Sequence, residues 1–457
     1  MPSSSFSARL FLLAFVVALI GAFLSIEELN LTALLMVIVF LVLEFRNAPR
    51  LQQIVGTSLA IMGLAAGAYS GTAIQVFVDG GVRTLPFLIL FTAVSWLQRP
   101  ATDSPSLMAM REMVINQPSG RRFIILALAI HALGSALNLA GLSLLSSMVE
   151  RQKDSLTRKR LSVALMMGFT SASCWSPFYV GIVVVLIAIP QLRWVDVALP
   201  GFAFALGIMA CGWAYDSFIV RGKEAAPSAN IVSPSTLPLS TIWNVCAILI
   251  SLVFLVLAMV ELVGLSIPVT LGLIGPPYAL IWNKLISGPD QPHPHKQLTS
   301  RVVSSFPGLR SETLVFGGAN IFGVGLSSLF SYEAIASAVN SLALIPSMLI
   351  SLIVLVIIAS GALGLHPVIV VIVIGEIFTP EILGVTPTFL GFALVGSWGL
   401  STLVSPMSAT TLYMSRVTGE ASHVIAWRWN FPIVILATML MGAILLISYQ
   451  FGIGKMT

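Results

Sequence analysis

Long apolar runs separated by short polar stretches dominate the pattern along the chain. A helix needs about 20 apolar residues to cross the hydrocarbon core of a bilayer, and thirteen runs approach or exceed that length. These runs span residues 9–25, 30–44, 52–70, 84–98, 123–150, 161–190, 197–217, 241–263, 265–283, 312–329, 352–378, 389–412 and 430–448. The pattern predicts an all-α polytopic membrane protein. We interpret the first run as a span, because no small-residue cleavage motif of a signal peptide follows it.

Composition and charge narrow the possible functions. Of the 457 residues, 57% are hydrophobic and 9% are charged, whereas soluble domains carry about 25% charged residues. The net charge of +5 is therefore interpreted as membrane sidedness, and we expect no nucleic acid as a partner. The three cysteines lie inside apolar runs without a CxxC pair, so neither disulfides nor a metal site is expected. Nucleotide-binding and metalloprotease motifs are absent from the sequence, and we expect no enzyme activity.

The basic residues indicate that two of the runs do not cross the membrane. Run 123–150 follows Arg121 and Arg122 and precedes five further bases between residues 151 and 160. Lysine and arginine favour the cytoplasmic side, and a single crossing cannot place both of its ends there. We expect residues 123–150 to form a re-entrant helical hairpin. Run 352–378 has a similar length and base-free flanks, and we expect a second hairpin that enters from outside.

The resulting topology has about eleven transmembrane helices and two re-entrant hairpins, with the N-terminus inside. It places twenty of the 23 bases on the cytoplasmic side and leaves Arg83, Arg193 and Lys455 outside. If both hairpins were ordinary spans, the bases would scatter across both faces. The positive-inside tendency therefore supports the hairpin interpretation.

An internal repeat with an offset of about 229 residues divides the chain. RTLPFLILF from Arg83 resembles ETLVFGGAN from Glu312, and GFTSASCWSP, which ends at Pro177, resembles GSWGLSTLVSP, which ends at Pro406. In the predicted topology the two copies run in opposite directions, which is typical of secondary transporters. The expected organisation is an extra N-terminal helix at 1–29, a first inverted repeat at 30–222, a linker at 223–240 and a second inverted repeat at 241–457.

Two polar positions lie at the midpoints of the expected hairpins. Asn138 ends the stretch GSALN in the first hairpin, and His366 ends GALGLH in the second. In each copy the next run carries a hydroxyl-rich patch that ends in Ser-Pro, and proline frees backbone carbonyls by disturbing the preceding turn. The expected substrate-binding residues are Asn138, Ser173, Ser176, His366, Ser401, Ser405 and Ser408. The expected residues for ion or proton coupling are His366, Glu376, Thr170 and Thr402.

Each of these residues also has a structural interpretation. A hydroxyl inside a membrane helix is commonly satisfied by a carbonyl of the previous turn. His366 could simply begin the second hairpin arm beside Pro367, although ionisable groups within a membrane are costly and usually functional. His131, which lies earlier in the first hairpin, is expected to be structural.

The layout resembles the ion transporter superfamily, which includes divalent-anion/sodium symporters, citrate carriers, arsenite efflux pumps and the large membrane subunits of tripartite carboxylate transporters. The resemblance covers nearly the whole chain and lies in the architecture. In the divalent-anion branch each hairpin tip bears Ser-Asn-Thr; here SALN ends at Asn138, LHP contains His366, and SATT occupies 408–411. The resemblance implies an elevator mechanism, in which hairpins and broken helices carry substrate past a scaffold that forms a homodimer.

These features predict a secondary active transporter for a small organic anion, carboxylate-like, coupled to Na⁺ or H⁺ and without any other cofactor. The expected location is the bacterial inner membrane or a similar energy-coupled bilayer. Three alternatives stay open. The chain could be an efflux permease for a metalloid oxyanion or drug, the membrane subunit of a carrier that needs an accessory subunit, or a non-transporting membrane assembly protein.

Overall fold

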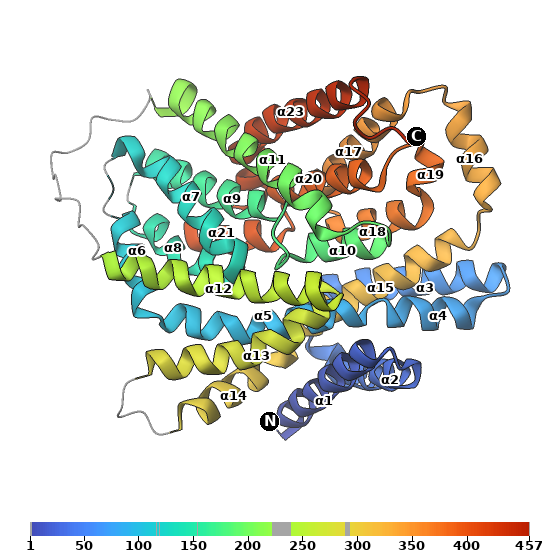
Figure 1. Ribbon diagram of the computed structural model, residues 1–457, viewed down its shortest axis with the longest axis horizontal. Helices are drawn as coiled ribbons and strands as arrows, with labels where there is room; N and C mark the ends of the chain where they lie inside the picture. The colour runs from blue at the N-terminus through green and yellow to red at the C-terminus, as the bar shows by residue number, and fades with distance from the viewer. Residues whose placement is uncertain are drawn as a thin grey trace. The chain divides into compact units, whose positions relative to one another are not determined.

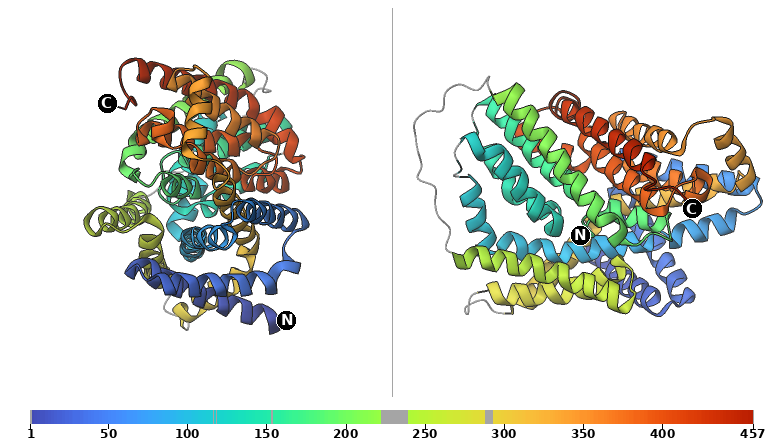
Figure 2. Two further views of the ribbon diagram at one scale, coloured as in Figure 1. Left: turned by 90° about the vertical axis from the view of Figure 1, so that its right-hand side faces the viewer. Right: turned by 45° about the horizontal axis from the view of Figure 1, so that its top comes forward.

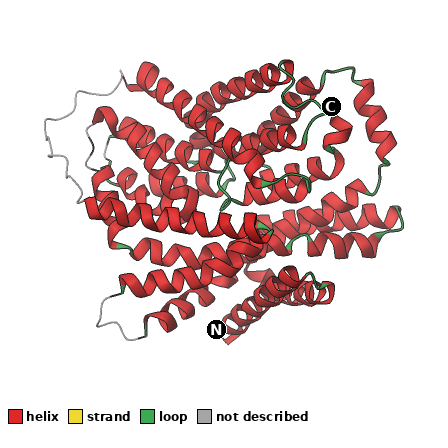
Figure 3. Ribbon diagram, viewed as in Figure 1, coloured by secondary structure: helices red, strands yellow, loops and turns green. Residues whose placement is uncertain are grey.

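The computed structural model describes residues 2–115, 117, 119–152, 154–221, 239–287 and 293–456. Within these ranges the chain is helical, with short loops and no strand (Figure 3). The linker expected at 223–240 lies almost entirely outside the described residues, as does Lys153, one of the bases behind the first hairpin.

The helices follow the predicted apolar runs closely. In chain order they are α1 (Pro2–Leu24), α2 (Glu27–Glu44), α3 (Arg50–Tyr69), α4 (Ala73–Val82), α5 (Leu85–Asp103), α6 (Pro105–Ile115), α7 (Ser119–Leu137), α8 (Leu139–Glu150), α9 (Ser155–Ala172), α10 (Val180–Ala188), α11 (Trp194–Tyr215), α12 (Leu239–Val263), α13 (Ile267–Ile286), α14 (Pro294–Ser305), α15 (Arg310–Ser327), α16 (Tyr332–Ser341), α17 (Pro346–Ala362), α18 (Pro367–Ile377), α19 (Pro380–Leu383), α20 (Pro387–Val404), α21 (Ala409–Thr418), α22 (Ser422–Val424) and α23 (Phe431–Gln450). Helices α4, α6, α14, α16, α19 and α22 fall outside the thirteen runs.

Eight helical stretches in the described part of the chain are long and apolar enough to cross a membrane. The number is nine if Pro294–Ser327 and Tyr332–Ser341, which meet at 84°, count as one bent span. The fourth stretch covers Ala73–Asp103, so it begins earlier than the predicted run 84–98. Helices α8, α17 and α18 are apolar but only 12, 17 and 11 residues long. The protein is therefore a multi-pass membrane protein in which several apolar helices are too short to span alone.

The chain divides into two compact units, and each unit takes segments from both halves of the sequence. Unit 1 comprises Met1–Ser104, Ile250–Ala334 and Ile372–Ile377. Unit 2 comprises Pro105–Leu249, Ile335–Val371 and Phe378–Thr457. Both expected hairpins lie in unit 2 except for the last residues of α18, which belong to unit 1.

Glycines bring two long helices of unit 1 into backbone contact. Helices α3 and α15 run side by side (Figure 1). Gly318 packs on Gly56, and a methyl group at Gly325 would lie 2.7 Å from the Cα of Gly63. Small residues at such spacing are the usual basis of close helix packing in membranes, because they let dispersion contacts form between backbones.

Unit 2 is built around α9 and α20. Helix α7 packs along α9, and α17 packs along α20, so each hairpin lies against the next long helix of its own half. Helices α11 and α23 lie side by side next to them (Figures 1 and 2). A buried ion pair joins α9 to the end of α11, where Arg160 Nε and Nη2 each donate to an Asp216 carboxylate oxygen at 2.7 Å. This bidentate pair satisfies both charges at once.

Candidate functional site

Two helices of unit 2 are interrupted at a proline. The helix that begins as α9 ends at Ala172 and resumes as α10 at Val180, with Pro177 in the interval. Helix α20 ends at Val404 and α21 begins at Ala409, with Pro406 between them. A proline has no amide hydrogen to donate, so the preceding turn cannot continue as a regular helix. Both Ser-Pro patches of the sequence are therefore helix breaks.

The first hairpin tip is bonded to the first break. Asn138 separates α7 from α8 with φ +52° and ψ −132°, a conformation that lies outside the left-handed helical region and favours glycine. Its amide Nδ2 donates to the carbonyl oxygen of Phe178 at 3.3 Å. From the break, the buried hydroxyl of Ser176 donates to the carbonyl oxygen of Ser135. The tip and the break thus hold each other through reciprocal hydrogen bonds.

The second hairpin tip lies beside α20. The chain leaves α17 at Ala362 and enters α18 at Pro367, with His366 just before it. The imidazole Nδ1 of His366 accepts from the amide of Val368 at 3.2 Å. Its ring meets the indole of Trp398 edge-on, with the ring centroids 6.2 Å apart. This side chain therefore lies between the tip and α20.

Helix α20 contacts both parts of the site. We call the first tip with its break the first half-site, and the second tip with its break the second half-site. A Cβ at Gly399 would lie 3.0 Å from the Cys174 sulfur and 3.2 Å from the Ser173 hydroxyl, both at the end of α9. A Cβ at Gly181, in α10, would lie 2.9 Å from the indole of Trp398, the residue that faces His366. The first break and the second tip therefore meet across two consecutive residues of α20.

Most of the predicted hydroxyls make local bonds. Thr170 donates to the carbonyl of Met166 at 2.8 Å, and Ser173 donates to the carbonyl of Thr170 at 2.6 Å. Ser405 accepts from the amide of Met407 at 3.3 Å. Ser408 caps α21 by accepting from the amide of Thr411 at 3.2 Å. These bonds shape the breaks, as the structural interpretation of hydroxyls in membrane helices expects.

Ser401 differs from the other hydroxyls. It is fully buried in α20 beside Gly361 of α17, and its Oγ has no hydrogen-bond partner among the described residues. Thr402, the next residue, is half-buried in the same helix. A buried hydroxyl without a partner is unfavourable unless water or a ligand satisfies it, so Ser401 stays a candidate ligand-binding group.

Glu376 belongs to a different part of the structure. It lies in the last turns of α18, within unit 1, where its carboxylate forms an ion pair with Arg83 at the end of α4. Its negative charge is therefore neutralised by a neighbouring base.

His131 sits in a buried polar cluster. Its Nε2 accepts from the indole N–H of Trp175 at 3.1 Å, so this nitrogen carries no proton. The Nδ1–H can then donate to the Ser171 hydroxyl, 2.9 Å away. These bonds tie α7 to the end of α9. In the described part of the chain, no three His, Cys, Asp or Glu residues are placed to hold a metal ion.

Sequence reasoning does not single out Trp398, Gly399 or Tyr179 as site residues. Tyr179 donates its hydroxyl to the carbonyl of Phe169 at 3.0 Å and packs on Gly134 of α7. In the sequence, aromatic residues and glycines inside apolar runs are indistinguishable from core residues. Only the contacts of α20 with α9 and α10 show that these residues lie at the site.

The chain is similar to known proteins in its fold and not in its sequence. No protein-family model matches the chain, and no curated protein matches its sequence. The fold is similar to the YdaH transporter of Alcanivorax borkumensis, with a TM-score of 0.57 and 12% identity over 82% of this chain and 88% of that one. The chain shares the fold of that structure. MtrF of Neisseria gonorrhoeae, described among a class of antimetabolite efflux pumps, gives a TM-score of 0.55 and 13% identity over 81% of this chain and 82% of that one.

Proposed function

We propose that the protein is a secondary active transporter for a small organic anion, coupled to Na⁺ or H⁺. The observation that carries this proposal is the meeting of the first break and the second hairpin tip across Trp398 and Gly399 in unit 2. Many transporters build their binding site from interrupted helices within the membrane, and such backbone is tolerated where protein or a water-filled cavity covers it.

The proposed anion site uses helix N-termini instead of fixed positive charges. Helices α8 and α10 both begin at the first half-site, and neither has a side-chain cap at its N-cap residue, Asn138 or Tyr179. Amides in the first turn of a helix are not used within the helix and carry partial positive charge. They can bind a carboxylate without a buried cation. An anion neutralised by a coupling ion then crosses the membrane at lower cost.

Coupling is assigned to the second half-site. Ser401 offers a buried hydroxyl without a partner, and the break after Val404 offers carbonyls, which together suit Na⁺. His366 offers an imidazole for H⁺. The pH dependence of transport distinguishes Na⁺ coupling from H⁺ coupling. His366→Gln flattens the pH profile of transport only if the imidazole carries the coupling proton.

We further propose an inverted repeat with an elevator mechanism. The breaks at Pro177 and Pro406, and the N-cap residues Tyr179 and Ser408 that follow them, keep the offset of about 229 residues. The short helices α8 and α18 suit hairpins that reach mid-membrane. In this proposal unit 2 carries the substrate and unit 1 forms the scaffold of a homodimer in the inner membrane, with about eleven spans and the N-terminus inside.

Uptake into proteoliposomes tests the proposal. The purified chain is reconstituted alone, and labelled mono- and dicarboxylates are offered with an imposed Na⁺ or H⁺ gradient. We expect gradient-driven uptake, and a loss of about tenfold or more in the double variant Asn138→Ala, His366→Ala. Ser351→Ala is the control, because its hydroxyl donates to the backbone carbonyl of Ser347 within α17. Unchanged uptake in the double variant would refute the site, and uptake that ignores both gradients would refute the coupling.

Export is a second candidate function, because the fold is similar to that of MtrF, which is described as an antimetabolite efflux pump. The same site would then bind an anionic drug or a metalloid oxyanion. Cells that lack the protein become more sensitive to the exported compound, whereas loss of an importer gives no such sensitivity. Transport by the reconstituted chain alone also excludes an obligate accessory subunit.

A further inference from the structure

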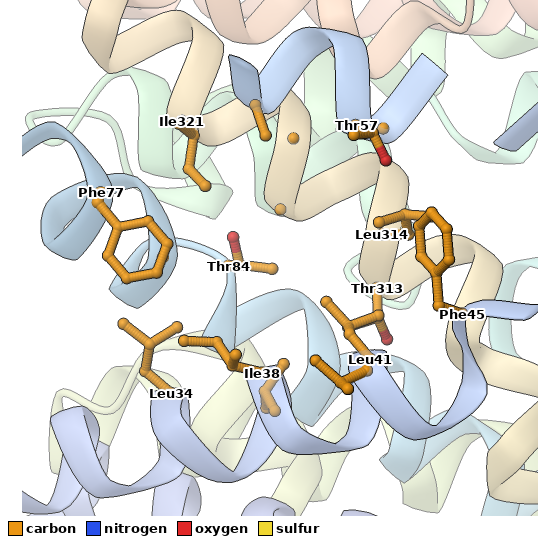
Figure 4. Close-up of a pocket in the computed structure, with 17 residues that line it drawn as sticks. Leu34, Ile38, Leu41, Phe45, Thr57, Phe77, Thr84, Thr313, Leu314 and Ile321 are labelled. Atoms are coloured by element: carbon orange, nitrogen blue, oxygen red, sulfur yellow. The ribbon is translucent and has the colours of Figure 1, made fainter. Parts of the chain in front are cut away.

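Unit 1 contains a cavity of about 450 Å³ that plays no part in the proposed transport site (Figure 4). Helix α2 forms one wall through Leu34, Ile38 and Leu41, and α15 contributes Leu314 and Ile321 to the other side. Phe77 of α4 points into the same space. We propose that this cavity binds one acyl chain of an anionic phospholipid.

The lining offers an occupant almost no hydrogen bonds. Two of its threonines already donate to backbone carbonyls four residues earlier: Thr84 to that of Gly80 at 2.9 Å, and Thr313 to that of Leu309 at 2.7 Å. A hydrated organic anion would lose its water there without gaining partners, which is unfavourable. A hydrocarbon chain has no hydration shell to lose when it enters.

The length of the cavity suits one leaflet of a bilayer. Its lining runs along α2 from Leu34 to Phe45, the residue just after the helix, which is about 16 Å at 1.5 Å per residue. Half of the hydrocarbon core is about 15 Å thick. Val42, which lines the cavity, is 72% exposed, so the wall opens to the outer face of α2, where lipid tails lie.

Charge at one end of the cavity selects the headgroup. Phe45 lines this end, and the next bases along the chain, Arg46 and Arg50, are both exposed. The nearby carboxylate of Glu44 is buried and receives hydrogen bonds from Ser7 at 2.6 Å and Arg310 at 3.5 Å. The two exposed guanidinium groups therefore remain to attract a phosphate at the membrane surface.

A larger side chain at Gly317 would fill the cavity. Gly317 lines the cavity on α15, and a Cβ at this position meets no atom within 4 Å. Gly442 of α23, in unit 2, also has open space at its Cβ and is the matched control. Ala60→Phe fills the cavity from α3 and replaces Gly317→Phe if that variant does not fold.

The test uses the full-length protein in detergent with phosphatidylglycerol that carries a photoactivatable group in its acyl chain. We expect labelled peptides from 34–60 and 313–321, and a fall in labelling of about tenfold in Gly317→Phe but not in Gly442→Phe. We also expect the preference for phosphatidylglycerol over phosphatidylcholine to drop about fivefold for Arg46→Gln or Arg50→Gln. Arg301→Gln, an exposed base on α14, should leave it unchanged.

Three results would overturn the proposal. Labelling that Gly317→Phe and Ala60→Phe both leave intact would mean that the tail lies outside the cavity. Equal labelling by both lipids in the wild type would show that binding does not depend on an anionic headgroup. Crosslinks between two protein copies at Leu41 or Leu314, without lipid label, would assign the space to a dimer contact.

Discussion

The two hairpin tips of unit 2 occupy matching places in the sequence but are held differently. The first tip is bonded to the break beside it, through Asn138 to Phe178 and through Ser176 to Ser135. The second tip meets α20 through the ring of His366 and the packing of Gly361 on Ser401. The first half-site is thus shaped by reciprocal hydrogen bonds, whereas the second presents an imidazole and a buried hydroxyl. The comparison favours binding at the first tip and coupling at the second.

The largest expected effect comes from the crossing that both tips share. Gly399→Leu would place a side chain against Cys174 and the carbonyl of Thr170. Overpacking of this kind costs about 1–3 kcal/mol, and it would separate α9 from α20. We expect a clear fall in thermal stability and loss of transport. Gly442→Leu, which has open space, should behave like the wild type in the same assays; equal damage in both would show that the crossing is not special.

The second largest effect concerns the backbone at the first tip. Asn138→Ala should lose the bond to Phe178 and keep a Cβ on a backbone with φ +52° and ψ −132°, where strain costs about 1–3 kcal/mol. Asn138→Gly removes the same side chain without the strain. We expect Gly to restore stability but not substrate affinity, measured as the KM of uptake. Restored affinity in the glycine variant would mean that the amide only shapes the turn.

A third, smaller effect separates a satisfied hydroxyl from an unsatisfied one. Ser173→Ala removes a hydroxyl bonded to Thr170, and uptake should change little. Ser401→Ala removes the hydroxyl without a partner, and we expect the apparent affinity for the coupling ion to fall about tenfold. The two variants are compared by measuring uptake as a function of Na⁺ and H⁺ concentration. If both variants titrate alike, coupling does not involve the second half-site.

The smallest effect lies outside the membrane, at the start of α9. Hydrogen bonds from the side chain and backbone of Thr157 lower the pKa of the Asp154 carboxyl below its ordinary value of 3.8. The charged cap therefore stabilises the helix fully above that value, and the contribution disappears as pH falls through the lowered pKa. Asp154→Ala should slightly lower the thermal midpoint at pH 7, with a difference that shrinks in acid. Asp154→Asn keeps a cap without a charge and should remove the pH dependence.

The sequence was sufficient for features that depend on neighbouring residues. Apolar runs located the long helices, and Pro177 and Pro406 located the breaks because proline acts on its own turn. Helix α4 was missed because Asp79 and a glycine pair interrupt its apolar pattern. Contacts between residues far apart in the chain could not be predicted from the local pattern. The pairing of Glu376 with Arg83, 293 residues away, and the meeting of Trp398 with Gly181 depend on tertiary packing that no local signal encodes.

The backbone contact between α3 and α15 also offers a way to recognise distant relatives. Gly56 and Gly63 are separated by seven residues, as are Gly318 and Gly325, and each glycine of one helix packs on one of the other. A larger side chain at any of these positions would push the two helices apart. We therefore expect homologues that are too diverged for ordinary alignment to keep small residues in this paired spacing, which can serve as a search pattern.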